Sequence, residues 1–185
     1  MALSWQMMMT GVFDDGGRPA GPEARIWQTD PRTLREVVVD RAAMEARLGE
    51  YPSVERVWVL SLLGRGGQAV AEGELLLSGS RERLRPLLVL AHARWFQYQW
   101  HEAALLHEQA LRLARFPARE ALVRYEIGRC FFDEGRYADA AAELDWACGL
   151  YRAAGHERLA RVCRQALDRA RAVLAAAGHA GNWPI

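Results

Sequence analysis

Histidine and cysteine are the residue types of this chain best suited to metal binding or nucleophilic chemistry. The histidines show neither HExxH spacing nor a cluster of three with a carboxylate. Two of them, His101 and His107, are six positions apart on one predicted helix, about 600° around its axis, so they point in different directions. The cysteines lack CxxC spacing and lie inside predicted helices, which indicates buried, reduced thiols. We therefore expect no metal and no cofactor from this set: His92, His101, His107, His156, His179, Cys130, Cys148 and Cys163.

Phosphate-binding and catalytic motifs are also missing from the sequence. The chain has no lysine, so all 24 cationic side chains are arginine and a GxxxxGK[ST] loop is impossible. The glycine-rich stretch Gly64-Arg65-Gly66-Gly67 is explained by a turn between helices. Cys130 has a basic neighbour in Arg129 but no His and Asn or Asp context. These absences predict a protein that is not an enzyme, and an enzyme is kept only as the second alternative.

Charge and hydropathy limit the kinds of partner that this protein is expected to bind. The 185 residues carry a formal net charge of +1, with 25% charged and 51% hydrophobic residues. General attraction to nucleic acid or to an anionic membrane needs a pronounced basic excess, which this chain lacks. The start, MALSWQMMMTGVF, has no cationic region or cleavage pattern, and no apolar run approaches about 18 residues. We expect a cytoplasmic protein with no membrane span and with another protein as its partner.

Two helical segments with a tight turn between them form the clearest pattern in the chain. Segments 122–133 and 137–153 flank Glu134-Gly135-Arg136. Gly128 is predicted to face Ala140 and Ala147, where small residues let two helix backbones approach closely. Larger apolar side chains surround that predicted contact, namely Ile127, Phe131, Leu144 and Leu150.

This stretch resembles a tetratricopeptide repeat (TPR). The residues that match the repeat are Ile127, Gly128, Phe131, Gly135, Tyr137, Ala140, Leu144 and Ala147. Arg124 stands where the family usually has an aromatic residue, and the late proline is missing. The resemblance implies an all-α fold, with antiparallel helix pairs stacked as a right-handed solenoid and a C-terminal capping helix. It also implies a protein-binding scaffold.

A second copy of the pattern lies 37 residues earlier, close to the usual period of about 34. A shift of 37 positions aligns Ala91 with Gly128 and Trp100 with Tyr137. The same shift aligns Ala103 with Ala140, Ala110 with Ala147 and Leu113 with Leu150. A weaker copy has its turn at Gly64. We therefore predict a helical array over 29–178, with pairs at about 50–80, 84–116 and 118–155, a cap at 157–177 and a tail at 179–185. A further helix at 31–48, with Asp30 as N-cap and Gly49 as C-cap, is expected to cover the end of the array.

The first helix of each pair lines the concave groove in proteins of this family, so the resemblance assigns a binding surface. That surface combines arginine with aromatic side chains, the composition of binding hot spots. For Phe96 and Phe132, packing between helices is an equal alternative. The groove residues would bind a peptide or helix of another protein: Arg85, Leu88, His92, Trp95, Phe96, Tyr125, Arg129, Phe132 and Asp133.

A nucleic-acid-linked regulator is the first alternative. Its basis is a group of arginines on the last predicted helix, opposed there only by Glu157 and Asp168. A solvated face of a capping helix explains the same residues. The alternative basic face consists of Arg158, Arg161, Arg164, Arg169 and Arg171.

Residues 1–28 form the least regular part of the sequence. Large apolar side chains are costly to leave in water, at roughly 1.5 to 3 kcal/mol each. We predict an arm that packs on the helical array or on a second copy of the chain, giving a homodimer; a loosely packed tail is the alternative interpretation. Its apolar residues are Trp5, Met7, Met8, Met9, Phe13 and Trp27.

Overall fold

The structure, a computed structural model, describes residues 26–180 and the side chains of residues 26–177. The chain divides into two compact units. The first contains Glu36–Arg115 and, of the described residues, 26–29, whereas the second contains Asp30–Arg35 and 116–180. All but the last three residues of the predicted arm at 1–28 lie outside the described residues, as do residues 181–185 of the predicted tail.

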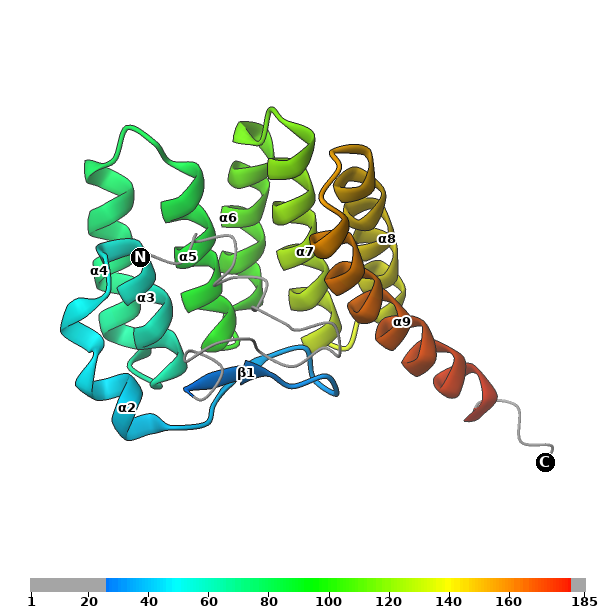
Figure 1. Cartoon of the computed structure of the whole chain (residues 1–185), viewed down its shortest axis with the longest axis horizontal. Helices are drawn as coiled ribbons and strands as arrows, with labels where there is room; N and C mark the ends of the chain where they lie inside the picture. The colour runs from blue at the N-terminus through cyan, green and yellow to red at the C-terminus, as the bar shows by residue number, and fades with distance from the viewer. Residues whose placement is uncertain (1–25, 181–185) are drawn as a thin grey trace. The chain divides into compact units, whose positions relative to one another are not determined.

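The first unit begins with a short antiparallel hairpin. Strand β1 (Trp27–Thr29) pairs with β2 (Glu36–Val38), with Trp27 opposite Val38 and Thr29 opposite Glu36. Helices follow in close succession, and consecutive long helices run side by side (Figure 1). They are α2 (Arg41–Ala46), the 3-10 helix η2 (Leu48–Glu50), α3 (Ser53–Leu62), α4 (Gly66–Gly79), α5 (Leu84–Phe96) and α6 (Trp100–Leu113).

The second unit has three long helices. Helix α7 (Pro117–Asp133) packs against α8 (Tyr137–Ala153), and α8 packs against α9 (Glu157–Ala180). The end of α9 extends beyond the α7–α8 pair, as Figure 1 shows in red. Accordingly, Leu174 near that end is exposed, whereas Leu167, two turns earlier, is fully buried. Residues 179 and 180 continue this helix, so the predicted tail begins later than expected.

The described part of the chain is mostly helical, with eight α-helices and a single two-stranded sheet. The predicted all-α class is confirmed at this level, with the hairpin as the exception. Between residues 26 and 180, no helix combines the length and the apolar character needed to cross a membrane.

The same turn closes four of these helices. In each, one residue has a left-handed backbone, its N–H bonds to the carbonyl three residues back, and the next N–H reaches the carbonyl five residues back. This is the hydrogen-bond pattern of a Schellman motif, and glycine adopts its left-handed position without steric cost. Tyr98 occupies that position after α5. It lies 34 residues after Gly64 and 37 before Gly135. The four left-handed residues are Gly64 (φ 74°), Tyr98 (φ 59°), Gly135 (φ 85°) and Gly155 (φ 73°).

Small residues lie where α7 and α8 meet. Ala140 and Ala147 have no exposed surface, and a Cβ atom on Gly128 would lie 2.7 Å from Cγ of Leu144 and 3.3 Å from the carbonyl oxygen of Ala140. Such separations leave no room for a methyl group, so the close approach depends on glycine. The predicted contact of Gly128 with α8 is therefore confirmed.

Arg124 connects α7 to α8. Its guanidinium bonds to Glu120 at 2.8 Å on its own helix and to Glu143 at 2.9 Å on α8. It also lies over the ring of Trp146, 3.4 Å from the centroid. Arg124 thus joins the two helices through ion pairs and a cation–π contact.

The helix predicted at 31–48 is wrong. Asp30 does not cap a helix: its Oδ1 accepts from the N–H of Arg32, and its carbonyl accepts from the N–H of Leu34, at 2.8 Å each. Such a local side-chain bond competes with helix formation, and the β-branched run 37–39 favours a strand. The helix begins ten residues later, where Asp40 accepts from the N–H of Ala43 at 2.9 Å and caps α2. Gly49 lies inside η2 and is not a C-cap of α2.

Candidate functional site

Helix α7 carries the most unusual polar cluster of the second unit. The helix begins at Pro117 after the extended residue Phe116 and ends before the left-handed turn at Gly135. Glu126, Arg129 and Asp133 are three and four positions apart, so their side chains share one side of the helix. We call these three residues the α7 face.

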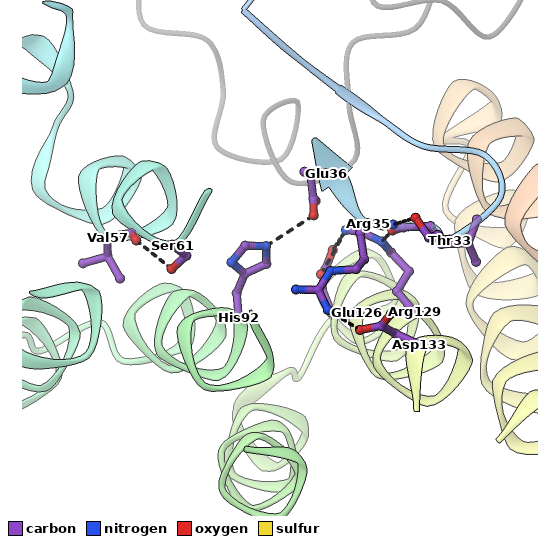
Figure 2. Close-up of polar contacts among 10 residues, drawn as sticks. Thr33, Arg35, Glu36, Val57, Ser61, His92, Glu126, Arg129 and Asp133 are labelled. Carbon is purple, nitrogen blue, oxygen red and sulfur yellow. Dashed lines mark hydrogen bonds and ion pairs between the residues drawn. The ribbon is translucent and has the colours of Figure 1, made fainter. Parts of the chain in front are cut away.

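Arg129 in the α7 face holds a main-chain carbonyl. Its Nε and Nη2 atoms both donate to the carbonyl oxygen of Leu34, at 2.9 and 2.6 Å. Its Nη1 atom lies 3.3 Å from Glu126 Oε2 and 3.4 Å from Oε1 (Figure 2). Both side chains are buried, with 1% of Arg129 and 2% of Glu126 exposed. A guanidinium can be buried here because the carboxylate balances its charge and the carbonyl accepts two of its donors.

Residues 32–35, the short segment that contains Leu34, make two further contacts in the second unit. Asp133 Oδ2 lies 2.6 Å from Nη1 of Arg35, and both side chains are mostly buried. Arg169 of α9 donates from Nε to the carbonyl oxygen of Arg32 at 3.2 Å. Residues 32–35 are therefore held through two main-chain carbonyls and one arginine side chain.

The aromatic residues predicted beside the α7 face are interior residues. Tyr125 is 4% exposed and lies beneath the guanidinium of Arg129, 5.6 Å from ring centroid to Cζ. Phe132 is 5% exposed and packs edge-on against Tyr137 at 5.2 Å. Packing between helices, the alternative for Phe132, is what the structure shows.

The other predicted groove residues lie on α5, in the first unit. His92 Nε2 lies 3.3 Å from Glu36 Oε2 on β2, with 1% of the histidine side chain and none of the glutamate side chain exposed (Figure 2). Arg85 is half-exposed and bonds to Glu55 of α3 at 3.0 Å. The α5 and α7 sets of the predicted groove thus belong to different units.

Aromatic rings surround His92. Phe96 stacks on its imidazole at 4.2 Å, and Trp95 meets it edge-on at 5.4 Å. Trp58 of α3 lies 6.2 Å away and packs in turn against Trp27 of β1 at 4.8 Å. Trp58, His92 and Trp95 are buried in the core of the first unit, whereas Phe96 stays partly exposed.

The predicted exposed groove is therefore corrected. Leu88, His92, Trp95 and Arg129 are at most 1% exposed, whereas Arg85, Phe96 and Asp133 are partly exposed. The hairpin strands cover His92 in the first unit, and the hairpin loop covers Arg129 in the second. The spacing of apolar residues along a helix cannot reveal this burial, because the segment that covers the side chains is distant in the sequence.

Three further buried residues, His107, Cys130 and Cys163, have shifted pKa values. Burial, and secondarily the charge of His92, lowers the pKa of His107 from 6.5 to about 4. Burial raises the pKa of Cys130 to about 12, helped by the neighbouring carboxylates, and burial also raises the pKa of Cys163. Raised values keep these thiols protonated. Within residues 26–180, no group of three or more histidine, cysteine or acidic residues could hold a metal ion.

The arginines of the alternative basic face lie on the side of α9 opposite its buried apolar residues. Arg158, Arg161 and Arg171 are exposed, whereas Arg164 and Arg169 are half-buried. Arg171 lies 3.5 Å from Asp145 of α8, and Arg169 holds the carbonyl of Arg32. One member of this set therefore belongs with the segment at the α7 face.

Four residues of these two sites were not predicted from the sequence. Glu126 could have been found from its three-residue spacing to Arg129, which is typical of an ion pair on a helix. Leu34, Arg35 and Glu36 carried no such signal, because they were assigned to a helix. Their contacts span 56 to 98 positions of the chain.

Fold and site together define a mostly helical protein in which α7 holds a segment of its own chain. No family model, curated protein or solved structure matches this chain.

Proposed function

We propose that this protein is a non-enzymatic interaction scaffold that holds an extended segment of another protein on the α7 face. One observation carries the proposal: the buried guanidinium of Arg129 offers two donors to a single main-chain carbonyl. Every peptide has such carbonyls, so this contact can hold a main chain whatever its side chains are. Asp133 adds selectivity, because its carboxylate pairs with a cation, here Arg35.

The TPR-like arrangement is part of this proposal. The repeated turns, 34 and 37 residues apart at Gly64, Tyr98 and Gly135, support it, as do the small residues buried between α7 and α8. The right-handed stacking and the role of α9 as a cap stay predictions. Solution scattering from the purified chain would test them, since a solenoid and a globular bundle of equal mass differ in radius of gyration.

A cytoplasmic location is likewise proposed. Cys130, Cys148 and Cys163 are free and buried, as thiols of a reducing compartment are expected to be. The predicted homodimer through residues 1–28 also stays a prediction. Removing that segment and measuring the sedimentation mass would test it.

The test of the function is Asp133→Ala. This variant removes the selective carboxylate while leaving the Arg129–Glu126 pair in place. We expect partners captured from an extract of the source cell by the immobilised wild-type chain to be lost. The matched control is Asp139→Ala on α8, whose carboxylate is half-exposed and pairs with Arg136. Capture that is equal for wild type and Asp133→Ala would refute the α7 face as the binding site.

Substitutions at Trp95 or Arg129 are unsuitable for that test. Trp95 has no exposed surface, and truncating a buried tryptophan to alanine costs about 3 to 5 kcal/mol. Arg129→Ala would leave Glu126 as a buried charge without its ion-pair partner. Loss of capture in either variant would report unfolding as readily as loss of binding.

Nucleic-acid binding through α9 is the second candidate. The observation in its favour is that Arg158, Arg161 and Arg171 are exposed on one side of a single helix. Binding to single-stranded or duplex DNA should then weaken steeply as salt is raised, because phosphate contacts release counterions. Arg158→Ala combined with Arg161→Ala should reduce that salt dependence. Unaltered binding in the double variant would remove this candidate.

A further inference from the structure

Residues 30–35, which join β1 to β2, make the contacts of a bound peptide. In the second unit, Arg129 and Arg169 donate to the carbonyl oxygens of Leu34 and Arg32, and Asp133 pairs with Arg35. The Leu34 side chain is also buried, with 6% exposed. Side chains of two helices thus hold two backbone carbonyls and a cation of this segment.

The backbone of this segment is strained at Leu34. Its φ of 58° lies in the left-handed region, which L-residues with a Cβ atom adopt at a steric cost. Such a conformation persists only where the surroundings hold it, and such residues cluster at ligand clamps and switch regions. Here Arg129 fixes the carbonyl of the strained residue itself. A separate peptide could offer a carbonyl to Arg129 without adopting this conformation.

We propose that residues 30–35 are an internal ligand of the α7 face, and that the external partner displaces them with a segment in which an apolar residue is followed directly by arginine. This inference rests on the proposed function and specifies its ligand. The order of residues comes from Leu34 and Arg35: the first supplies the carbonyl for Arg129 and a buried apolar side chain, and the second supplies the cation for Asp133.

Displacement is a competition between a tethered and a free ligand. A segment tethered by a short stretch of chain acts at an effective concentration in the millimolar range, so it weakens the apparent affinity of any external peptide. Weakening the internal ligand should therefore tighten external binding. Arg35→Ala does this without altering the α7 face, because Arg35 belongs to the loop and not to the helix.

The experiment measures fluorescence anisotropy with a labelled synthetic peptide, QTDPRTLREV, which is the sequence of residues 28–37. Arg35→Ala should bind it about tenfold more tightly than the wild-type chain, the change expected when one charge-assisted hydrogen bond of the competitor is lost. Arg35→Lys, which keeps the cation, should stay close to wild type. Arg112→Ala on α6 is the matched control, because its side chain is exposed and pairs only loosely with Glu108, at 4.0 Å.

Two further measurements test whether the peptide binds at Asp133. Adding Asp133→Ala to Arg35→Ala should abolish the gain in affinity, and a peptide with alanine in place of its second arginine should show no gain. Melting curves of every variant verify that the chain remains folded. An affinity gain that survives Asp133→Ala would overturn the inference.

The outcomes separate the two proposals. Equal peptide binding by wild type and Arg35→Ala, lost in Asp133→Ala, would overturn the internal ligand and leave the α7 face as a binding site. A peptide that binds no variant would overturn both. A doubled sedimentation mass for Arg35→Ala would identify a second copy of the chain as the occupant and would also overturn the external partner.

Discussion

Arg129 and Glu126 form an ion pair one turn apart on α7, and the two side chains are almost completely buried, at 1% and 2% exposed. Removing one partner of a buried pair leaves an uncompensated charge away from water. Arg129→Ala is therefore expected to lower the free energy of unfolding by about 3 to 5 kcal/mol. Urea denaturation of the purified variant measures this loss.

The same pair should show coupling in a double-mutant cycle. Glu126→Ala with Arg129→Ala removes both charges, so the double variant should lose clearly less stability than the sum of the single losses. Losses that add to within about 0.5 kcal/mol would show that the two side chains do not stabilise each other.

The α7–α8 crossing should not tolerate a methyl group at Gly128. Alanine favours helix by about 1 kcal/mol over glycine, but its Cβ would lie 2.7 Å from Cγ of Leu144. Overpacking costs about 1 to 3 kcal/mol, so we expect Gly128→Ala to lower the melting temperature.

Gly149→Ala is the control for that substitution. It lies in α8, where a Cβ atom would meet nothing within 4 Å, so the helix preference alone should raise the melting temperature. A rise for both variants would mean that α7 and α8 are less closely packed than described.

The buried histidine His107 should make stability depend on pH. Its pKa falls from 6.5 in the unfolded chain to about 4 in the folded one, so between these values the unfolded chain binds more protons. The contribution to stability is therefore lost as pH falls from about 6.5 to 4, and it amounts to about 3 kcal/mol when complete.

Unfolding free energies measured by urea at several pH values would reveal this loss. His107→Gln should flatten the curve in that window, whereas His101→Gln, at an exposed position of the same helix, should not. A slope unchanged by His107→Gln would assign the pH dependence to other groups.

The three thiols should react only after unfolding. Cys130, Cys148 and Cys163 are buried, and burial raises the pKa of Cys130 to about 12 and also raises that of Cys163. Because the thiolate is the reactive form, a thiol-specific chromogenic reagent at pH 8 should modify the native chain slowly and the denatured chain at three sites. Rapid modification of one native thiol would contradict its burial.

The helix pairs were predictable because their signals are local. Gly135 marks a left-handed turn, and Ala140 and Ala147 lie at helical spacing on the side that packs against Gly128. The left-handed backbone at Tyr98 had no signal in its residue type, because tyrosine carries no preference for that conformation. Its position 34 residues after Gly64 was the only available signal.

The hairpin was not predictable in the same way. Asp30 and Pro31 fit a helix start by residue type, yet Asp30 bonds locally to Arg32, and Val37 and Val38 pair with β1. Residue types at a helix start and at a turn overlap, since aspartate satisfies backbone N–H groups in both. Pairing with another strand decided between the two.

The sequence by itself determined the helical class, the turns at glycine and the small residues at the α7–α8 crossing, because each depends on neighbours within one or two helical turns. Only the tertiary structure decided what covers the predicted groove residues. His92 and Arg129 have the same types and spacing whether they face solvent, a partner or their own chain. Their burial depends on Glu36 and Leu34, 56 and 95 positions away, and no local periodicity records contacts across that distance.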